Sequence, residues 1–264
     1  LHSFPTRRSS DLPTTTPKFS NFETLKTVPH DYKLVENEDD LHKLYDYFFT
    51  KQILSLDTET TSTNAIDAEL VGLSFAVEEH EAFYVPIPPC RDDAQKIVNI
   101  FKPLYENENI LKVGQNLKYD LEVLHNYGVE LKGKMWDTMI AHYLIQPELR
   151  HNMDYMAEIY LNYQTIHIDE LIGPKGKNQR SMRDLQPAQV YEYAAEDADV
   201  TLRLKNKLEP ELKKFECEDL FYDIEMPLMP VLAEMEMTGV VLDTGSLMQT
   251  SKELTQRMNE MEAR

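Results

Sequence analysis

The sequence has few cysteines, no long hydrophobic run and a shortage of basic residues. Its 264 residues include only two cysteines, Cys90 and Cys217, which excludes a disulfide framework and fits a reducing cytoplasm. No apolar segment reaches membrane-spanning length and no signal-peptide pattern appears, so we expect a cytoplasmic protein with no membrane partner. The 27 lysines and arginines stand against 46 aspartates and glutamates, a formal net charge of −19. This charge disfavours nucleic acid as a partner unless basic residues cluster locally, or metal ions or another domain supply positive charge.

The first 30 residues lack hydrophobic periodicity and are interrupted by four prolines, so we expect them to be disordered. The opening segment, 1–12, differs in character from the rest and is interpreted as non-native. The whole chain is 42% hydrophobic and 28% charged, which is typical of a globular protein, and it is long enough to bury a large core.

Apolar patterning in the remainder predicts a sheet with helical crossovers. The expected strands are 32–35, 53–56, 70–77, 82–87 and 110–113, with the third and fourth joined as an antiparallel hairpin through the turn at 78–80. The expected helices are 38–49, 92–105, 117–127, 137–144, 153–161 and 187–215. This order predicts a mixed α/β sheet with helices on both faces.

The last stretch differs in composition from what precedes it. Residues 218–237 are apolar and rich in methionine, residues 240–242 are expected to form a strand, and Asp243 or Thr244 is expected to cap a final amphipathic helix. We therefore divide the chain into a first domain at 31–216 and the mainly helical beginning of a second domain at 217–264.

Two carboxylates follow the apolar run that begins at Ile53. Asp57 and Glu59 alternate with Thr58, and alternate side chains of a strand point to the same face. Two close carboxylates repel each other unless a cation lies between them, and Mg²⁺ or Mn²⁺ prefers such oxygen ligands. The alternative is an ordinary polar loop after a strand.

Two further acidic motifs are expected near the same edge of the sheet. Asp120 begins the helix after strand 110–113, so it lies near a strand end as Asp57 does. Tyr193 and Asp197 are four residues apart on a long helix and share one face. Simpler interpretations are a helix-start acid at Asp120 and solvated acids on the long helix.

Taken together, these motifs resemble a known family. The order Asp-X-Glu, a later Asp and then Tyr-X-X-X-Asp resembles the tyrosine-bearing branch of the DEDD exonuclease superfamily. The segments VGQNLKYD at 113–120 and YAAEDADVT at 193–201 are similar to the proofreading domain of bacterial DNA polymerase I, family A. LVGLSF at 70–75 and WDTM at 136–139 also match, and 225–240 resembles the entry into the polymerase domain of that family.

The resemblance, which covers about residues 30–264, implies an RNase H-like fold and metal-dependent 3′→5′ hydrolysis of a single-stranded DNA end. It implies two divalent ions, Mg²⁺ or Mn²⁺, or Zn²⁺ at one of the two sites. In that mechanism Asp57 bridges both ions, and Glu59 and Asp197 complete the shell of the first. Asp120 holds the second ion through water, and Tyr193 orients the attacking water.

Substrate contacts are also implied by the resemblance. Asn116, Tyr119 and Arg150 match positions that contact the substrate strand. The basic stretch 175–183 is either a phosphate-holding loop or a solvated connection, and Asp137 is expected to be structural. Where the family often carries an apolar wedge, this chain has Thr61-Ser62-Thr63, which leaves open how the terminal bases are separated.

We therefore predict a DNA 3′→5′ exonuclease that proofreads for a polymerase domain of the same protein. Two alternatives stay open. One is an RNA-trimming 3′→5′ exonuclease of the same superfamily, and the other is a catalytically silent, exonuclease-like structural domain.

Overall fold

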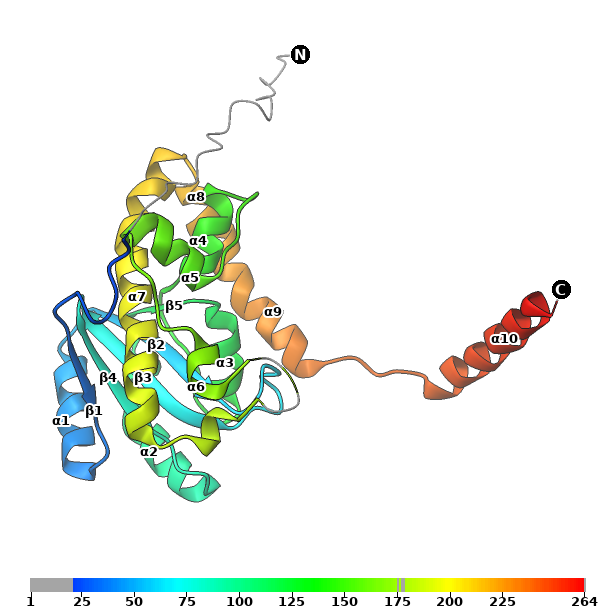
Figure 1. Ribbon diagram of the computed structural model, residues 1–264, viewed down its shortest axis with the longest axis horizontal. Coiled ribbons are helices and arrows are strands. Elements are labelled where there is room, and N and C mark those ends of the chain that lie inside the picture. The colour runs from blue at the N-terminus through cyan, green and yellow to red at the C-terminus, as the bar shows by residue number, and fades with distance from the viewer. Residues whose placement is uncertain (1–20, 175, 177–178, 264) are drawn as a thin grey trace, which may run out of the picture.

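The computed structural model describes residues 21–174, 176 and 179–263, and is built around a six-stranded mixed sheet (Figure 1). The strand order is β1-β4-β3-β2-β5-β6. The strands are β1 Asp31–Leu34, β2 Ile53–Thr60, β3 Leu70–Glu78, β4 Glu81–Pro86, β5 Leu111–Gly114 and β6 Met135–Asp137. β2, β3 and β4 are antiparallel neighbours, while β1 runs parallel to β4, and β5 and β6 run parallel to β2 and to each other.

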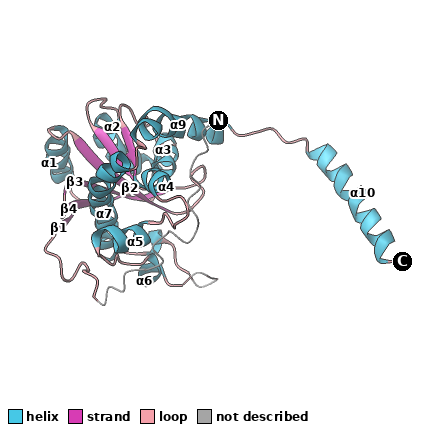
Figure 2. Ribbon diagram, turned by 90° about the horizontal axis from the view of Figure 1, so that it is seen from above, coloured by secondary structure: helices cyan, strands magenta, loops and turns pink. Residues whose placement is uncertain are grey.

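Helices cover both faces of this sheet, as the sequence predicts (Figure 2). The helices are α1 Glu38–Phe49, α2 Arg91–Tyr105, α3 Leu117–His125, α4 Thr138–Ile145, α5 Met153–Met156, α6 Ile168–Ile172, α7 Pro187–Lys214, α8 Glu218–Leu220, α9 Met226–Thr238 and α10 Thr244–Glu262. Shorter turns of other helix types lie at η2 Ala157–Leu161, η3 Met182–Asp184 and η4 Phe221–Glu225. Asn37 caps the first helix, because its side chain accepts from the Asp40 N–H.

The two faces are packed by different kinds of side chain. Against α1 and α2 the sheet presents large rings: the centroid of Phe75 is 5.3 Å from that of Phe48 and 5.1 Å from that of Phe101. Against α7 it presents small groups, and Ala195 and Ala198 pack on alanines of β3 and β4. Small side chains allow helix and sheet backbones to approach closely, so the Ser55 hydroxyl donates to the Ala198 carbonyl at 2.8 Å.

The C-terminal part divides into a packed helix and a separate one. Phe221 is fully buried and its ring centroid is 5.1 Å from that of Trp136, and α9 lies against α3. Helix α10 follows an extended link and stands apart from the sheet in Figure 1, with Leu254 and Met258 more than half exposed. The segment that ends with α9 thus packs on the first domain. The domain boundary at residue 217 stays a prediction.

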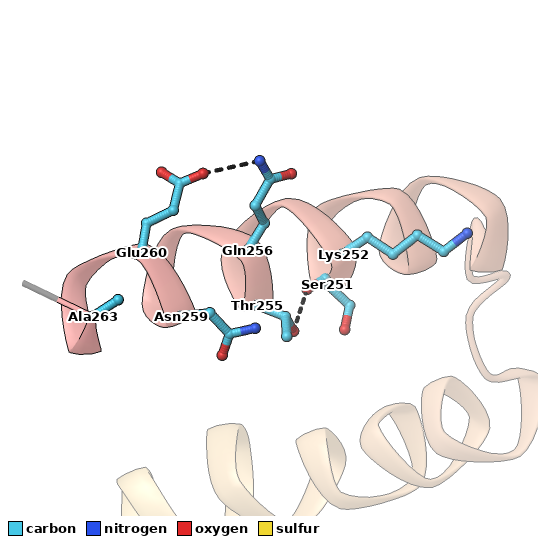
Figure 3. A pocket seen from close by; sticks show the side chains of 7 residues that line it. All are labelled: Ser251, Lys252, Thr255, Gln256, Asn259, Glu260 and Ala263. Atoms are coloured by element: carbon cyan, nitrogen blue, oxygen red, sulfur yellow. Dashed lines mark hydrogen bonds between the residues drawn. The ribbon is translucent and has the colours of Figure 1, made fainter.

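The face of α10 carries one shallow polar hollow (Figure 3). Its hydrogen bonds run within the helix, from Gln256 to Glu260 and from the Thr255 hydroxyl to the Ser251 carbonyl. The hollow is the surface of a single helix and offers no convergent set of chemical groups.

Three expectations from the sequence are corrected. Residues 240–242 do not form a strand, because no described segment lies beside them to supply hydrogen-bond partners, and Val241 is fully exposed. Residues 21–30 are not disordered throughout, since Glu23 exchanges backbone hydrogen bonds with the segment around Tyr163. The sequence predicts that Asp137 is the first residue of a helix. In the structure Asp137 is the last residue of strand β6, a strand that was not predicted, and it caps α4. Residues 1–20 of the expected disordered segment lie outside the described residues.

Within the described part of the chain, no helix is both long and apolar enough to cross a membrane.

Candidate active site

The first two carboxylates lie on strand β2 itself. The sequence predicts that this strand ends at Leu56, but it continues to Thr60 because β3 pairs with it as far as Thr60. Strand alternation places Asp57 and Glu59 on the same face as Ser55, whose hydroxyl reaches α7. Both carboxylates are therefore held between the sheet and α7 by regular backbone pairing.

A third carboxylate completes a compact group. One oxygen each from Asp57, Glu59 and Asp197 lies within 4.8 Å of the others. Asp197 is 6% exposed and comes from the middle of α7, where the small residues before and after it allow the helix to lie close to β2. The three side chains come from two elements that the sheet packing holds rigidly together.

The electrostatics of this group favour a bound cation. Burial raises the pKa of Asp57 to about 6. Burial and then the charge of Asp57 raise the pKa of Glu59 well above its usual value, and the pKa of Asp197 is raised by the same causes together with Glu59. The Glu59 Oε1 atom is buried and has no hydrogen-bond partner among the described residues. A buried oxygen without a donor, beside two further carboxylates, fits a divalent ion with oxygen ligands.

Asp120 adjoins this group without belonging to it. It lies in the first turn of α3, and its Oδ1 accepts from the Thr58 N–H at 3.0 Å and from the Thr58 hydroxyl at 2.7 Å. Burial raises its pKa well above the usual value, and the nearby charge of Asp57 adds to this shift. Asp120 is thus close enough to Asp57 for their charges to interact, and one of its oxygens already accepts two hydrogen bonds.

Tyr193 faces the same carboxylates from one turn earlier in α7. Its pKa is raised well above the usual value by burial first, and then by the charges of Asp197, Glu59 and Asp57. The phenol therefore stays protonated over the physiological range, and in this state it can donate a hydrogen bond.

A cleft of about 460 Å³ opens beside Glu59. One wall consists of residues 60–63, and it is stiffened by Tyr119, whose hydroxyl lies 2.5 Å from the Thr60 hydroxyl and donates to the Ser62 carbonyl. The lining also includes apolar side chains that sequence reasoning missed, Ile168 and Ile172 of the short helix α6. Their only local signal is the i, i+4 spacing of two isoleucines.

The expected substrate residues are placed differently from one another. Asn116 and Tyr119 line the cleft, and Asn116 takes a left-handed backbone conformation (φ 61°) just before α3. Arg150 is exposed in the link between α4 and α5 and does not line the cleft as described, so its role stays a prediction. Asp137 accepts from the Leu117, Met139 and Ile140 N–H groups, as expected of a structural residue.

The basic stretch at 175–183 is only partly described. Lys175 and Lys177 lie outside the described residues. Arg183 is structural, because its guanidinium donates to the Leu70 and Ile87 carbonyls. Arg180 lines the cleft.

Two acids of α7, Glu196 and Asp199, for which solvation was one of the interpretations, are fully buried. Asp199 accepts from the Tyr32 hydroxyl at 2.8 Å and from the His80 N–H at 2.6 Å. Glu196 accepts from the Tyr163 hydroxyl at 2.6 Å and from a backbone N–H of the same segment. These bonds fix α7, and hence Asp197, relative to the sheet.

Comparisons with known proteins agree with this arrangement. A family model described as 3′-5′ exonuclease matches residues 32–213. DNA polymerase I of Pseudomonas aeruginosa is 41% identical over 221 residues, which are 80% of this chain and 24% of that protein. DNA polymerase I of Borreliella burgdorferi is 32% identical over 232 residues, 87% of this chain and 25% of that protein. The chain thus spans about a quarter of the length of these relatives.

Solved structures share the fold. The POL domain of Pol1 from M. smegmatis, in complex with DNA primer-template and dNTP, has a TM-score of 0.69 at 20% identity, covering 86% of this chain and 36% of that one. Escherichia coli RNase D has a TM-score of 0.62 at 22% identity, covering 80% and 52%. Brucella melitensis NrnC with bound Mg²⁺ has a TM-score of 0.60 at 20% identity, covering 80% and 95%.

Proposed function

This chain belongs to the 3′-5′ exonuclease family that occurs in DNA polymerase I, and from that premise we propose that it removes nucleotides one at a time from single-stranded DNA 3′ ends. In this proposal it is the proofreading part of a longer polymerase. The observation that carries it is the group formed by Asp57, Glu59 and Asp197, held within 4.8 Å beside an open cleft.

Divalent metal ions are part of the proposed chemistry. Asp57, Glu59 and Asp197 would hold one ion, and Asp57 with Asp120 would hold a second, with Mg²⁺ or Mn²⁺ as the metal and Zn²⁺ as the alternative at one of the two sites. When bound, such ions stabilise the attacking and leaving oxygens of an in-line displacement at phosphorus. The crowding of the carboxylates and the unpartnered Oε1 of Glu59 support this assignment.

The protein's own groups would position the reactants. The protonated hydroxyl of Tyr193 would hydrogen-bond the attacking water and orient it. Asn116 and Tyr119 would contact the terminal nucleotide, since both line the cleft. Thr58 would keep Asp120 oriented through its two hydrogen bonds.

The polymerase partner follows from the C-terminal part. We place the exonuclease domain at 31–216 and the beginning of the next domain at 217–264. The apolar side chains of α10, Leu247, Leu254, Met258 and Met261, are all more than half exposed. A polymerase domain that follows in the same protein would cover them.

Nucleotide release from matched single-stranded oligonucleotides tests the proposal. We expect release of mononucleotides from DNA 3′ ends in Mg²⁺ or Mn²⁺, little release in EDTA, and little release by the Asp57→Ala variant. A faster reaction on RNA of the same sequence would instead favour an RNA-trimming enzyme, since the structural neighbour RNase D is an exoribonuclease. No metal-dependent release by the wild type would support a catalytically silent domain, and equal rates of release by wild type and Asp57→Ala would contradict the active-site assignment.

A further inference from the structure

The described part of the cleft has very little positive charge for a site that must bind a polyanion. Its lining includes one acidic side chain, Glu59, and one basic side chain, Arg180. The chain as a whole carries a net charge of −19, so the general field of the protein repels a nucleic acid strand. A local cation in the cleft therefore matters more here than in a basic protein.

Arg180 lies where two cavities meet. It lines the cleft that contains Glu59 and Tyr119, and it also lines a neighbouring cavity of about 340 Å³ that contains Tyr193. Glu59 on strand β2 belongs to the carboxylate group, and Tyr193 on helix α7 faces that group, so both cavities border it. A nucleic acid strand bound in either cavity would therefore lie near Arg180.

The Arg180 side chain is tethered but not neutralised. Its backbone N–H donates to the Ile172 carbonyl at 2.9 Å, and its Nη2 donates to the Leu171 carbonyl at 2.7 Å. A guanidinium has five N–H donors in a fixed plane, so most of them remain available to a ligand. Although Glu170 and Glu192 line the same cavity, Arg180 makes no ion pair with any described carboxylate.

Other cations near the site are already used by the protein. Lys118, which lines the next hollow along the cleft, forms ion pairs with Glu122 and Glu236. Arg183 is occupied by two backbone carbonyls and also approaches Glu69 at 3.8 Å. Among the described residues, Arg180 alone combines a place in the cleft with a charge that no protein group compensates.

We propose that Arg180 is a substrate-binding residue that holds the backbone phosphate next to the scissile bond. This rests on the proposed exonuclease function and specifies its substrate as a strand with a charged phosphate at that position. The guanidinium would pair with the two non-bridging oxygens of the phosphate. The Leu171 and Ile172 contacts would fix its direction before the strand arrives.

The test combines a protein change with a substrate change. Arg180→Gln should raise KM for a single-stranded DNA oligonucleotide about tenfold, the scale of one charged hydrogen bond, with kcat changed less. For this variant, the slope of log KM against log salt concentration should be smaller than that of the wild type by about 0.7, the value for one phosphate contact on a single strand. Arg180→Lys should restore part of the loss, and Lys43→Gln, which removes an exposed lysine of α1, should match the wild type.

Substrates with one uncharged methylphosphonate linkage locate the contact. Placed next to the scissile bond, this linkage should weaken the wild type about as much as Arg180→Gln does, and should weaken Arg180→Gln little further, because both changes remove the same interaction. A KM within twofold of wild type together with an unchanged salt slope would overturn the proposal. So would a variant with a lowered melting temperature that still shows the full methylphosphonate penalty, since the role would then be structural.

Binding separates this inference from the function it rests on. Fluorescence anisotropy of the labelled oligonucleotide in EDTA measures affinity without cleavage. If the wild-type protein releases no nucleotides, the proposed function fails, and the affinities of wild type and Arg180→Gln still decide the role of Arg180. If the wild type is active and the two affinities agree within twofold, the inference about Arg180 alone fails.

Discussion

Helix α7 contributes buried acids to two groups, and the groups differ in what surrounds the carboxylate oxygens. Glu196 and Asp199 accept hydrogen bonds from tyrosine hydroxyls and backbone N–H groups, and Arg203 lies 3.6 Å from Asp199. Asp197, between them in sequence, instead faces Asp57 and Glu59. One group is satisfied by the protein, while the other contains carboxylates that repel one another.

The surroundings of an acid on α7 separate those that the protein satisfies from the one that faces other carboxylates. Burial alone does not do so, because Glu196, Asp197 and Asp199 are all buried. Among these three the surroundings do, because Glu196 and Asp199 have donors while Asp197 faces two further carboxylates, and a buried carboxylate without donors or a counter-ion is costly to keep charged. Helix α7 is therefore bound to the rest of the protein through Glu196 and Asp199, while Asp197 contributes to the group that could hold a cation.

The largest expected effect is on activity, at the unsatisfied group. Asp197→Asn should lower the rate of nucleotide release by about 1,000-fold, because groups that only support metal ligands are already worth ~10–100-fold. In EDTA the variant should be at least as stable as the wild type, because one of three repelling charges is gone. Nucleotide-release assays and urea unfolding measure the two effects. A marked loss of stability in EDTA would contradict the comparison.

The satisfied group should respond in the opposite way. Asp199→Ala leaves Tyr32, the His80 N–H and Arg203 without their acceptor, and should lower the free energy of unfolding by about 3 kcal/mol. Urea unfolding in EDTA measures the change. The matched control is Glu211→Ala on the same helix, whose partner Lys214 is exposed, and it should change stability by less than about 0.5 kcal/mol. Similar losses in both variants would show that position on α7, and not hydrogen bonding, sets the cost.

The acids of the candidate metal site were predictable because the sequence spacings that indicate them are short. Asp57 and Glu59 lie two residues apart on a strand, and Tyr193 and Asp197 lie four apart on a helix. The sequence alone shows both spacings, and the sharing of one sheet edge by strand ends predicts that the pairs meet. The resemblance to a proofreading family points to the same residues.

The satisfied group was not predictable because its partners are distant. Asp199 is bound by Tyr32, 167 residues away, and by the backbone of residue 80. Strand β6 has three residues and exists only because β5 lies beside it, and β2 reaches Thr60 only because β3 pairs with it. Conversely, residues 240–242 are strand-like in composition but have no partner among the described segments, so their composition was misleading. Pairing between distant segments decided each of these cases.

Magnesium should stabilise the protein only through the unsatisfied group. At a Mg²⁺ concentration about 100 times the dissociation constant, the free energy of unfolding should rise by about 2.7 kcal/mol. Asp197→Asn should gain much less, and Asp199→Ala should gain as much as wild type from its lower starting point. Urea unfolding with MgCl₂, against NaCl of equal ionic strength, measures this. Equal gains in wild type and Asp197→Asn would place the bound ion elsewhere.

A buried histidine offers an intermediate case, with one satisfied nitrogen and one without a partner. The Nδ1 atom of His142 lies 2.8 Å from Nδ1 of His151, while its Nε2 is buried with no hydrogen-bond partner among the described residues. Burial first, and then the charge of His151, lower the pKa of His142 to about 4.

Because the folded-state pKa of His142 lies below the value of about 6.5 expected when unfolded, the unfolded chain binds the proton first as the pH falls. The stability that the neutral imidazole provides is present above pH ~6.5 and is lost progressively toward pH ~4. Between pH 7 and pH 5 the wild type should lose about 2 kcal/mol more than His142→Leu, as measured by urea unfolding at each pH. Parallel pH profiles for the two proteins would mean that His142 titrates normally, and that an unpartnered buried nitrogen costs less here than an unpartnered carboxylate oxygen.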